Sequence, residues 1–156
     1  MKAINLDGTI KTYTSIPKFW GNVVGGFNTL SDSDLETYGF YDVVTPSYNS
    51  NTQELGTIEW DSSNSVFTYP VNDKTFAQSL VELKAQKIAN LKHSYGIELK
   101  ETDWVIIRDQ ELGNTTDSDI LSLRATLRSD CATHESSINS KTTKAQVADY
   151  SLPNFI

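Results

Sequence analysis

Few side chains in this sequence have the chemistry for catalysis. The chain has two histidines, His93 and His134, and one cysteine, Cys131. Cys131 and His134 are three positions apart, so on a helix they would be neighbours that could form a thiolate pair or part of a metal site. Zinc sites, however, need at least three protein ligands. We therefore interpret Cys131 as a small apolar thiol and His134 as a packing residue, and we predict neither a catalytic residue nor a cofactor.

Two acidic clusters could hold calcium or act as acid–base pairs. One comprises Asp32, Asp34 and Glu36, and the other comprises Asp117 and Asp119. Both lie where helices are expected to begin, and carboxylates there interact favourably with the free amides and the helix dipole. We therefore predict that both clusters cap helices. The common motifs of nucleotide binding, zinc proteases and serine hydrolases are missing, so we expect a protein without enzymatic activity.

The aromatic side chains could instead stack on sugars or bases. Three are tryptophans, Trp20, Trp60 and Trp104, and seven are tyrosines. The chain has 13 Lys and Arg against 20 Asp and Glu, a net charge of −7 that disfavours nucleic acid and anionic membranes as partners. Its apolar runs are too short to span a bilayer and its first residues lack the pattern of a secretion signal, which predicts a soluble, unprocessed chain. Carbohydrate binding stays open as an alternative function.

Residues 1–72 have the pattern of a β-rich domain. Asp7 and Gly8 separate two short alternating runs, which predicts an N-terminal hairpin with a tight turn. Ser31, followed three residues later by an acid, predicts one or two turns of helix. Further runs of aromatic and β-branched residues between polar turns predict a small antiparallel meander at residues 40–44, 55–60 and 66–69.

Residues 73–156 have helical patterning. A first long helix is predicted over residues 73–95, ended by Gly96. Lys84 and Lys87 project into its apolar face, which indicates that part of this face is only half covered. Residues 97–113 are compatible with a short strand or with a turn of helix. The predicted apolar face consists of Phe76, Leu80, Val81, Leu83, Ile88, Leu91 and Tyr95.

A second long helix is predicted to begin near Asp117 or Ser118. Its apolar residues fall within an arc of about 80° at the helical period, like the strip of a coiled coil. A stripe this narrow cannot form a core alone, so the helix must lie along another helix or another chain. A helical turn at residues 144–150 and an extended apolar tail, docked or awaiting a partner, complete the chain. The stripe consists of Ile120, Leu123, Leu127, Cys131, His134 and Ile138.

Together these patterns predict an α+β protein. A small antiparallel β-rich head, residues 1–72, is followed by a two-helix unit, residues 73–156, arranged as a helical hairpin or in a coiled-coil-like manner. The acidity is concentrated in the head, where three basic residues stand against eight acidic ones.

A segment of the second half resembles a known group of families. The motif Thr102-Asp103-Trp104 follows an amphipathic helix, and Arg124 and Arg128 lie four residues apart in the next one, with an acid and a glycine in the connection. This pattern, over about residues 75–130, is similar to the C-terminal signature of bacteriophage tail assembly chaperones and tail-fibre assembly proteins. The resemblance implies a non-enzymatic tail or tail-fibre accessory protein, either a transient chaperone or a virion subunit, located in the virion or in the host cytoplasm during assembly.

The resemblance also implies a phage tail or tail-fibre polypeptide as the partner, with a homo-oligomer as a further possibility. A carbohydrate- or receptor-binding tip formed by the head, with Trp20, Trp60 and tyrosines, is the alternative. The residues predicted to contact the partner lie on the two helical faces and in the motif: Leu80, Leu83, Ile88, Leu91, Trp104, Ile120, Leu123, Arg124, Leu127, Arg128 and Ile138.

The same residues also have an interpretation in terms of folding alone. Trp104 would fill the space between two helices, and Asp103 would cap a turn. Arg108, Arg124 and Arg128 would pair with nearby carboxylates. The structure decides between these interpretations residue by residue.

Overall fold

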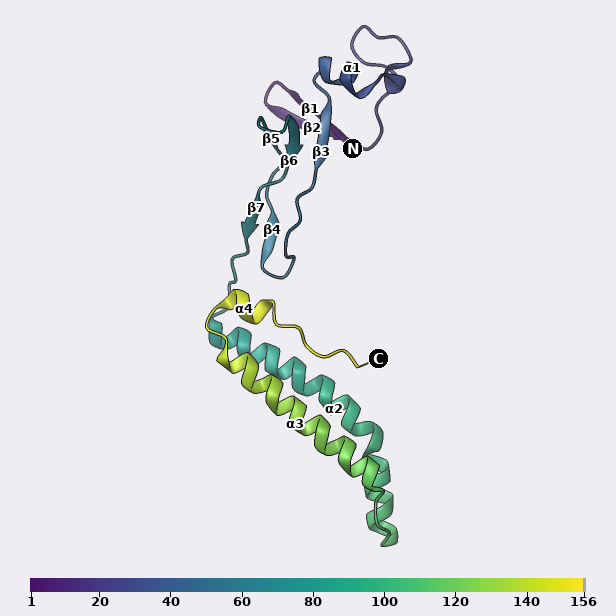
Figure 1. The fold of residues 1–156 in the computed structure, drawn as a ribbon, viewed down its shortest axis with the longest axis vertical. Helices are drawn as coiled ribbons and strands as arrows, with labels where there is room; N and C mark the ends of the chain where they lie inside the picture. The colour runs from purple at the N-terminus through teal and green to yellow at the C-terminus, as the bar shows by residue number, and fades with distance from the viewer. Residues whose placement is uncertain (156) are drawn as a thin grey trace. The chain divides into compact units, whose positions relative to one another are not determined.

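The computed structural model describes residues 1–155 (Figure 1). The chain divides into two compact units, Met1–Lys74 and Thr75–Ile156. The first contains strands and short helical segments, and the described part of the second has helices as its regular structure. The predicted α+β class, a β-rich region followed by two long packed helices, is confirmed. Within residues 1–155 no helix is both long and apolar enough to cross a bilayer.

The first unit contains a five-stranded sheet with strand order β2-β1-β3-β6-β5. Neighbouring strands are antiparallel except β3 and β6, which are parallel. β4 and β7 form a separate antiparallel pair. The strands are β1 (Lys2–Leu6), β2 (Thr9–Tyr13), β3 (Tyr41–Val44), β4 (Gln53–Leu55), β5 (Glu59–Asp61), β6 (Val66–Thr68) and β7 (Val71–Asp73).

The local signals in the first unit act as predicted. Asp7 and Gly8, with φ of 50° and 87°, form the turn of the β1–β2 hairpin. Helix α1 (Asp32–Thr37) begins after Ser31, whose hydroxyl accepts a hydrogen bond from the Asp34 amide at 3.2 Å. The prediction that Asp32 and Asp34 lie in the first turn of a helix is therefore confirmed.

The predicted antiparallel meander is wrong in its pairing. Residues 53–55 are not part of the five-stranded sheet and pair with β7 instead, and β3 pairs with β6 in parallel orientation. A polar turn still links β5 to β6, because Asp61 Oδ1 accepts hydrogen bonds from the amides of Ser63 at 2.9 Å and Asn64 at 3.3 Å. The hydrogen bond that the Asn64 side chain donates to this carboxylate, followed by those from the two amides, lowers the pKa of Asp61.

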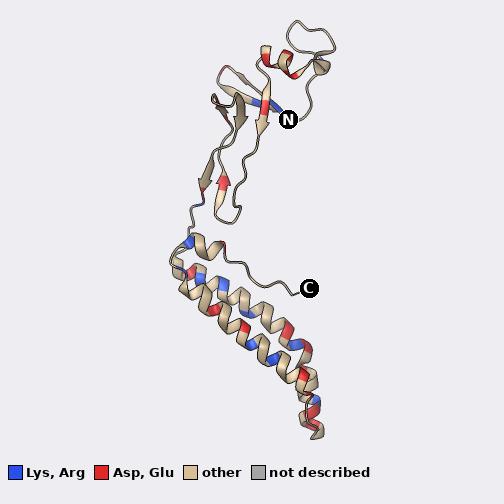
Figure 2. Ribbon diagram, in the orientation of Figure 1, with Lys and Arg blue, Asp and Glu red and all other residues tan. Residues whose placement is uncertain are grey.

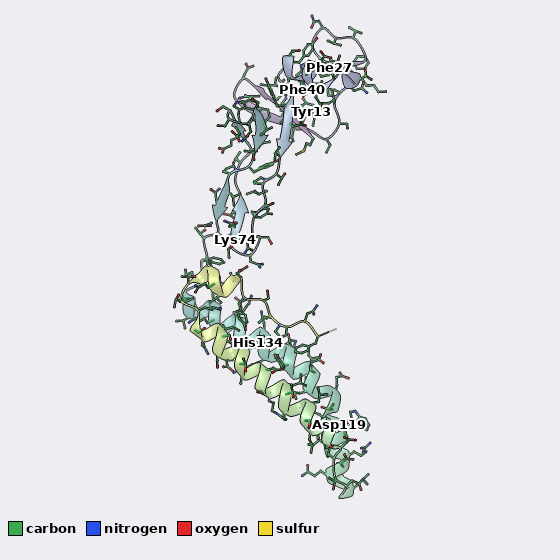
Figure 3. All side chains as sticks on the ribbon, viewed as in Figure 1. Tyr13, Phe27, Phe40, Lys74, Asp119 and His134 are labelled. Atoms are coloured by element: carbon green, nitrogen blue, oxygen red, sulfur yellow. The ribbon has the colours of Figure 1, made fainter. Side chains whose placement is uncertain are left out.

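The core of the first unit lies on one face of the sheet. Its buried residues are Ile4, Phe27, Leu35 and Phe40, and Tyr13, Phe27 and Phe40 gather in Figure 3. Trp20 packs into this cluster, with its ring centroid 4.7 Å from that of Phe40. Trp20 is therefore a core residue rather than part of an open binding surface.

The first long helix is longer than predicted and begins later. Helix α2 (Leu80–Leu112) starts after Ser79, which forms a capping box with Glu82, and ends at Gly113. The helix continues through Gly96, so the predicted stop there is wrong, and residues 97–112 are helical rather than a strand. Phe76 lies before the helix and is not on its face.

Two more helices complete the second unit. Helix α3 (Ser118–Ser140) begins after Asp117, whose carboxylate accepts a hydrogen bond from the Asp119 amide at 2.7 Å, as predicted. Helix α4 (Lys144–Ala148) is the predicted helical turn. Residues 149–155 form no helix or strand, but Leu152 and Phe155 pack against α2 and α3.

The narrow stripes of α2 and α3 cover each other. Leu91, Tyr95 and Ile138 are buried between the helices, and Tyr150, Leu152 and Phe155 close over them. The lysines in the α2 stripe donate hydrogen bonds to helix ends: Lys84 Nζ to the Asn139 carbonyl at 2.7 Å and Lys87 Nζ to the Ala148 carbonyl at 3.2 Å. They compensate carbonyls that lack helical partners and lie at the negative ends of α3 and α4.

Candidate partner-binding surface

Several residues predicted to bind a partner are used inside the chain. Leu91 and Ile138 have no exposed surface, and Ile88 and Leu127 pack against them. The narrow stripe of α3 is therefore covered by α2 and by the C-terminal segment of the same chain, and Leu91 and Ile138 belong to no exposed surface. The partly buried residues Leu80, Leu83 and Ile120 complete the predicted set on the two faces.

Leu123 was predicted to contact the other helix, but Arg124 makes this contact instead. Leu123 is 51% exposed, whereas Arg124 is 8% exposed. The Arg124 guanidinium donates to the Leu99 carbonyl at 2.7 Å, to the Thr102 hydroxyl at 2.6 Å and to the Asp103 carboxylate at 2.7 Å. Arg124 is three residues from Leu127 and Leu123 is four, so either position fits the spacing of three and four residues by which two helices pack.

This contact explains part of the signature motif by folding. Thr102 and Asp103 are both partners of Arg124, so they join α2 to α3. Figure 1 shows that α2 changes direction in its C-terminal part. The Leu99 carbonyl accepts hydrogen bonds from both Arg124 and the Thr102 hydroxyl, and competition of this kind with backbone hydrogen bonds bends helices.

Trp104 has no such folding role. Its side chain is 60% exposed, so it does not fill the space between the two helices. Its ring instead lies beneath the Arg108 guanidinium, 5.0 Å from the ring centroid. Arg108 in turn pairs with the buried Asp109 carboxylate at 2.7 Å. Asp109 thereby orients Arg108, and Arg108 orients the indole.

An open groove of about 720 Å³ lies beside Trp104 at the loop end of the helix pair. One wall comes from α2 and the other from the connection and the start of α3. Its lining combines an aromatic ring, aliphatic side chains, an ion pair and polar groups. The lining residues are Trp104, Val105, Arg108, Asp109, Asn114, Thr115, Asp117 and Ile120.

Several apolar residues that lie close to the groove residues in the sequence are exposed. Ile107 and Leu112 on α2 are 55% and 66% exposed, and Leu121 on α3 is 49% exposed. None of the three is assigned a role by the sequence analysis: residues 97–113 had no assigned element, and Leu121 lies outside the predicted stripe of the second helix. Their position in a long helix, away from the spacing of the buried residues, is the signal that could have identified them.

Ile107, Leu112, Leu121 and Leu123 do not form one face with the groove: Leu121 and Leu123, for example, are two positions apart and point to nearly opposite sides of α3. We call the loop-end surface the exposed indole of Trp104 together with the groove. Its charges do not select a cationic or anionic partner, because both signs alternate along α2 and α3 (Figure 2). Arg128, also predicted to contact a partner, is exposed and lines a smaller pocket that also contains Cys131.

Cys131 and His134 have ordinary packing environments. Burial raises the pKa of the Cys131 thiol, which keeps it protonated at neutral pH. His134 Nδ1 is 2.6 Å from the Tyr150 hydroxyl, so His134 (Figure 3) helps to hold the C-terminal segment. Within residues 1–155 no group of three or more His, Cys, Asp and Glu side chains is arranged to hold a metal ion.

Comparison of the chain with family models, curated proteins and solved structures gives no match. The features of the chain that bear on its function are therefore the geometry of the loop-end surface and the residues of the signature motif.

Proposed function

We propose that this chain is a non-enzymatic bacteriophage tail or tail-fibre accessory protein that binds a tail or fibre polypeptide through the loop-end surface. The observation that carries the proposal is the exposure of Trp104. The motif's other residues, Thr102 and Asp103, are accounted for by the contact with Arg124, whereas folding leaves most of the indole in water. A tryptophan held in place by an arginine is typical of the residues that dominate protein interfaces.

The lining of the groove supports a polypeptide as the partner. Trp104 and the aliphatic lining residues Val105 and Ile120 provide apolar surface whose burial favours binding. The groove adds carboxylates, a guanidinium and amide groups that could bind a peptide backbone. A helical or extended segment of a tail polypeptide is therefore the proposed occupant.

The first test replaces Trp104 by alanine. We expect Trp104→Ala to weaken binding of the tail or fibre polypeptide encoded by the same phage by at least about 2 kcal/mol, or about 30-fold in Kd. Calorimetric titration of the purified polypeptides measures this. Val81→Ala is the matched control, because Val81 is 75% exposed at the opposite end of α2. Equal affinities of Trp104→Ala and the unaltered chain would contradict the proposal.

Mass spectrometry of purified mature particles separates the two forms of the proposal. A fixed copy number in the particle identifies a virion subunit. Absence from the particle, with binding to an unassembled fibre polypeptide, identifies a chaperone. Absence from both rejects the proposed function.

A further inference from the structure

The core cluster of Ile4, Phe27, Leu35 and Phe40 lies against one face of the five-stranded sheet. Ile4, Leu6 and Tyr13 belong to the core cluster, so the alternate residues of β1 and β2 point to the other face. The pairings Ala3 with Tyr41 and Trp60 with Phe67 carry that second face across the sheet.

This second face carries three aromatic rings in mutual contact. The ring centroid of Trp60 lies 4.6 Å from that of Tyr41 and 5.0 Å from that of Phe67. Trp60 is 39% exposed although Phe67 beneath it is buried. Beside the rings lies an open pocket of about 280 Å³, which Asn5 and Gly39 also line. Its volume is at the lower end of the range for small-molecule sites, roughly 300 Å³.

Polar groups around the rings are available to a ligand. The Asn5 Oδ1 accepts a hydrogen bond from the Gly8 amide at 2.9 Å, which fixes the side chain and leaves its amide nitrogen as a donor. Within residues 1–155 the Tyr41 hydroxyl and the Trp60 indole N–H make no hydrogen bond to the protein. Apolar walls with a few polar groups of this kind are characteristic of ligand sites.

The charge of the surroundings selects the ligand. The residues that line the pocket are all uncharged, and residues 1–72 carry eight acids against three bases, which disfavours phosphates and carboxylates. A sugar ring presents C–H groups that an aromatic face attracts, and hydroxyls that both accept and donate hydrogen bonds. We propose that the Tyr41–Trp60–Phe67 pocket binds one ring of a neutral carbohydrate.

The test uses the full chain and the methyl glycosides of glucose, galactose, mannose and N-acetylglucosamine. Protein chemical shifts are followed by NMR through a titration into the millimolar range. We expect at least one glycoside to shift the signals of Asn5, Tyr41 and Trp60 in a saturable manner. No saturable shift at these residues with any of the four glycosides overturns the proposal.

Two tyrosine variants locate the site. Tyr41→Phe removes a hydroxyl that makes no hydrogen bond to the protein, so the fold is retained and we expect affinity to fall about fivefold. Tyr38→Phe is the control, because Tyr38 is 40% exposed in the same unit and does not line the pocket. Equal affinity of Tyr41→Phe and the unaltered chain overturns the assignment of the site.

Two tryptophan variants separate this proposal from the function of the helical unit. Trp60→Ala is expected to abolish sugar binding, whereas Trp104→Ala leaves it unchanged. Trp60→Ala should also leave the affinity for a tail polypeptide unchanged. If Trp60→Ala weakens binding of the polypeptide but not of the sugar, the face is a protein-docking surface and the carbohydrate proposal is wrong.

Discussion

Arg124 and Trp104 show that the residues of one motif differ in their contribution to folding. Arg124 is buried, and its guanidinium donates hydrogen bonds to the Thr102 hydroxyl, the Asp103 carboxylate and a backbone carbonyl of α2. Trp104, the next residue of the motif, is left in water. The interpretation by folding alone is therefore confirmed for the ion pair of Arg124 with Asp103, and it is wrong for Trp104 as a filler between helices.

Arg124→Ala should destabilise the helical unit. It removes a charged hydrogen-bonding group from a site with little exposure and leaves Thr102 and Asp103 without their partner. Because Asp103 is about half exposed, we expect a loss of about 2 kcal/mol in the free energy of unfolding, less than for a fully buried pair. Urea unfolding followed by circular dichroism measures it. Arg128→Ala, at an exposed position, is the control with a change within about 0.5 kcal/mol; similar losses for both would refute the role of Arg124.

Lys2 makes the stability of the first unit fall as the pH becomes alkaline. Its ammonium is buried between Asp32 at 2.9 Å and Asp42 at 3.2 Å. Burial lowers the pKa of Lys2, but the two carboxylates outweigh burial and hold it above the usual 10.5. A raised pKa in the folded state means that this contribution is complete below the unfolded value and is lost as pH rises through the folded one.

We therefore expect the difference in unfolding free energy between the unaltered chain and Lys2→Met to be constant at neutral pH and to shrink above pH 10.5. Urea unfolding followed by tryptophan fluorescence, in a Trp104→Phe background, reports the first unit. Lys11→Met, at an exposed position of β2, should show no such change. A difference that does not vary with pH contradicts the assignment.

At the scale of elements, glycines that look alike in the sequence have opposite roles. Gly96 lies inside α2, whereas Gly113 ends that helix with a φ of 68°. Neither position would bring an added Cβ within 4 Å of another residue. The backbone conformation alone therefore distinguishes them.

Gly96→Ala should stabilise the helical unit by about 0.5–1 kcal/mol, because alanine loses less conformational freedom in a helix. Gly113→Ala should destabilise it by about 1 kcal/mol, because a left-handed conformation disfavours a Cβ. Thermal unfolding at 222 nm compares the two variants. Destabilisation by Gly96→Ala would mean that α2 does not continue through this position.

The elements were predictable where a local signal was sufficient. The β1–β2 turn, the cap of α1 and the start of α3 each depend on a few neighbouring residues, and all were predicted. Ser79 and Glu82 are the same kind of signal for the start of α2, although the helix was predicted to begin earlier, at residue 73. The parallel pairing of β3 with β6 joins residues far apart in the chain, and no local pattern specifies it.

At the scale of the whole molecule, hydrophobic patterning was sufficient for the fold class and insufficient for the exposed surface. The narrow stripe of α3 was correctly predicted to need a neighbouring helix, and α2 of the same chain fulfils that need. The sequence therefore identified Trp104 and Leu123 as candidates but also included Leu91 and Ile138, which are buried. Cores and interfaces contain the same types of apolar residue, and only burial in the folded chain distinguishes one set from the other.

The contact between Phe155 and Tyr95, with ring centroids 4.8 Å apart, bears on the order of folding. Adjacent helices such as α2 and α3 join early, because little chain entropy is lost when nearby segments meet. The contact of Phe155 with Tyr95 closes a much larger loop, so we expect the segment that contains Phe155 to dock last. Until then Leu91 and Tyr95 remain partly uncovered, and a nascent chain at this stage is most vulnerable to aggregation.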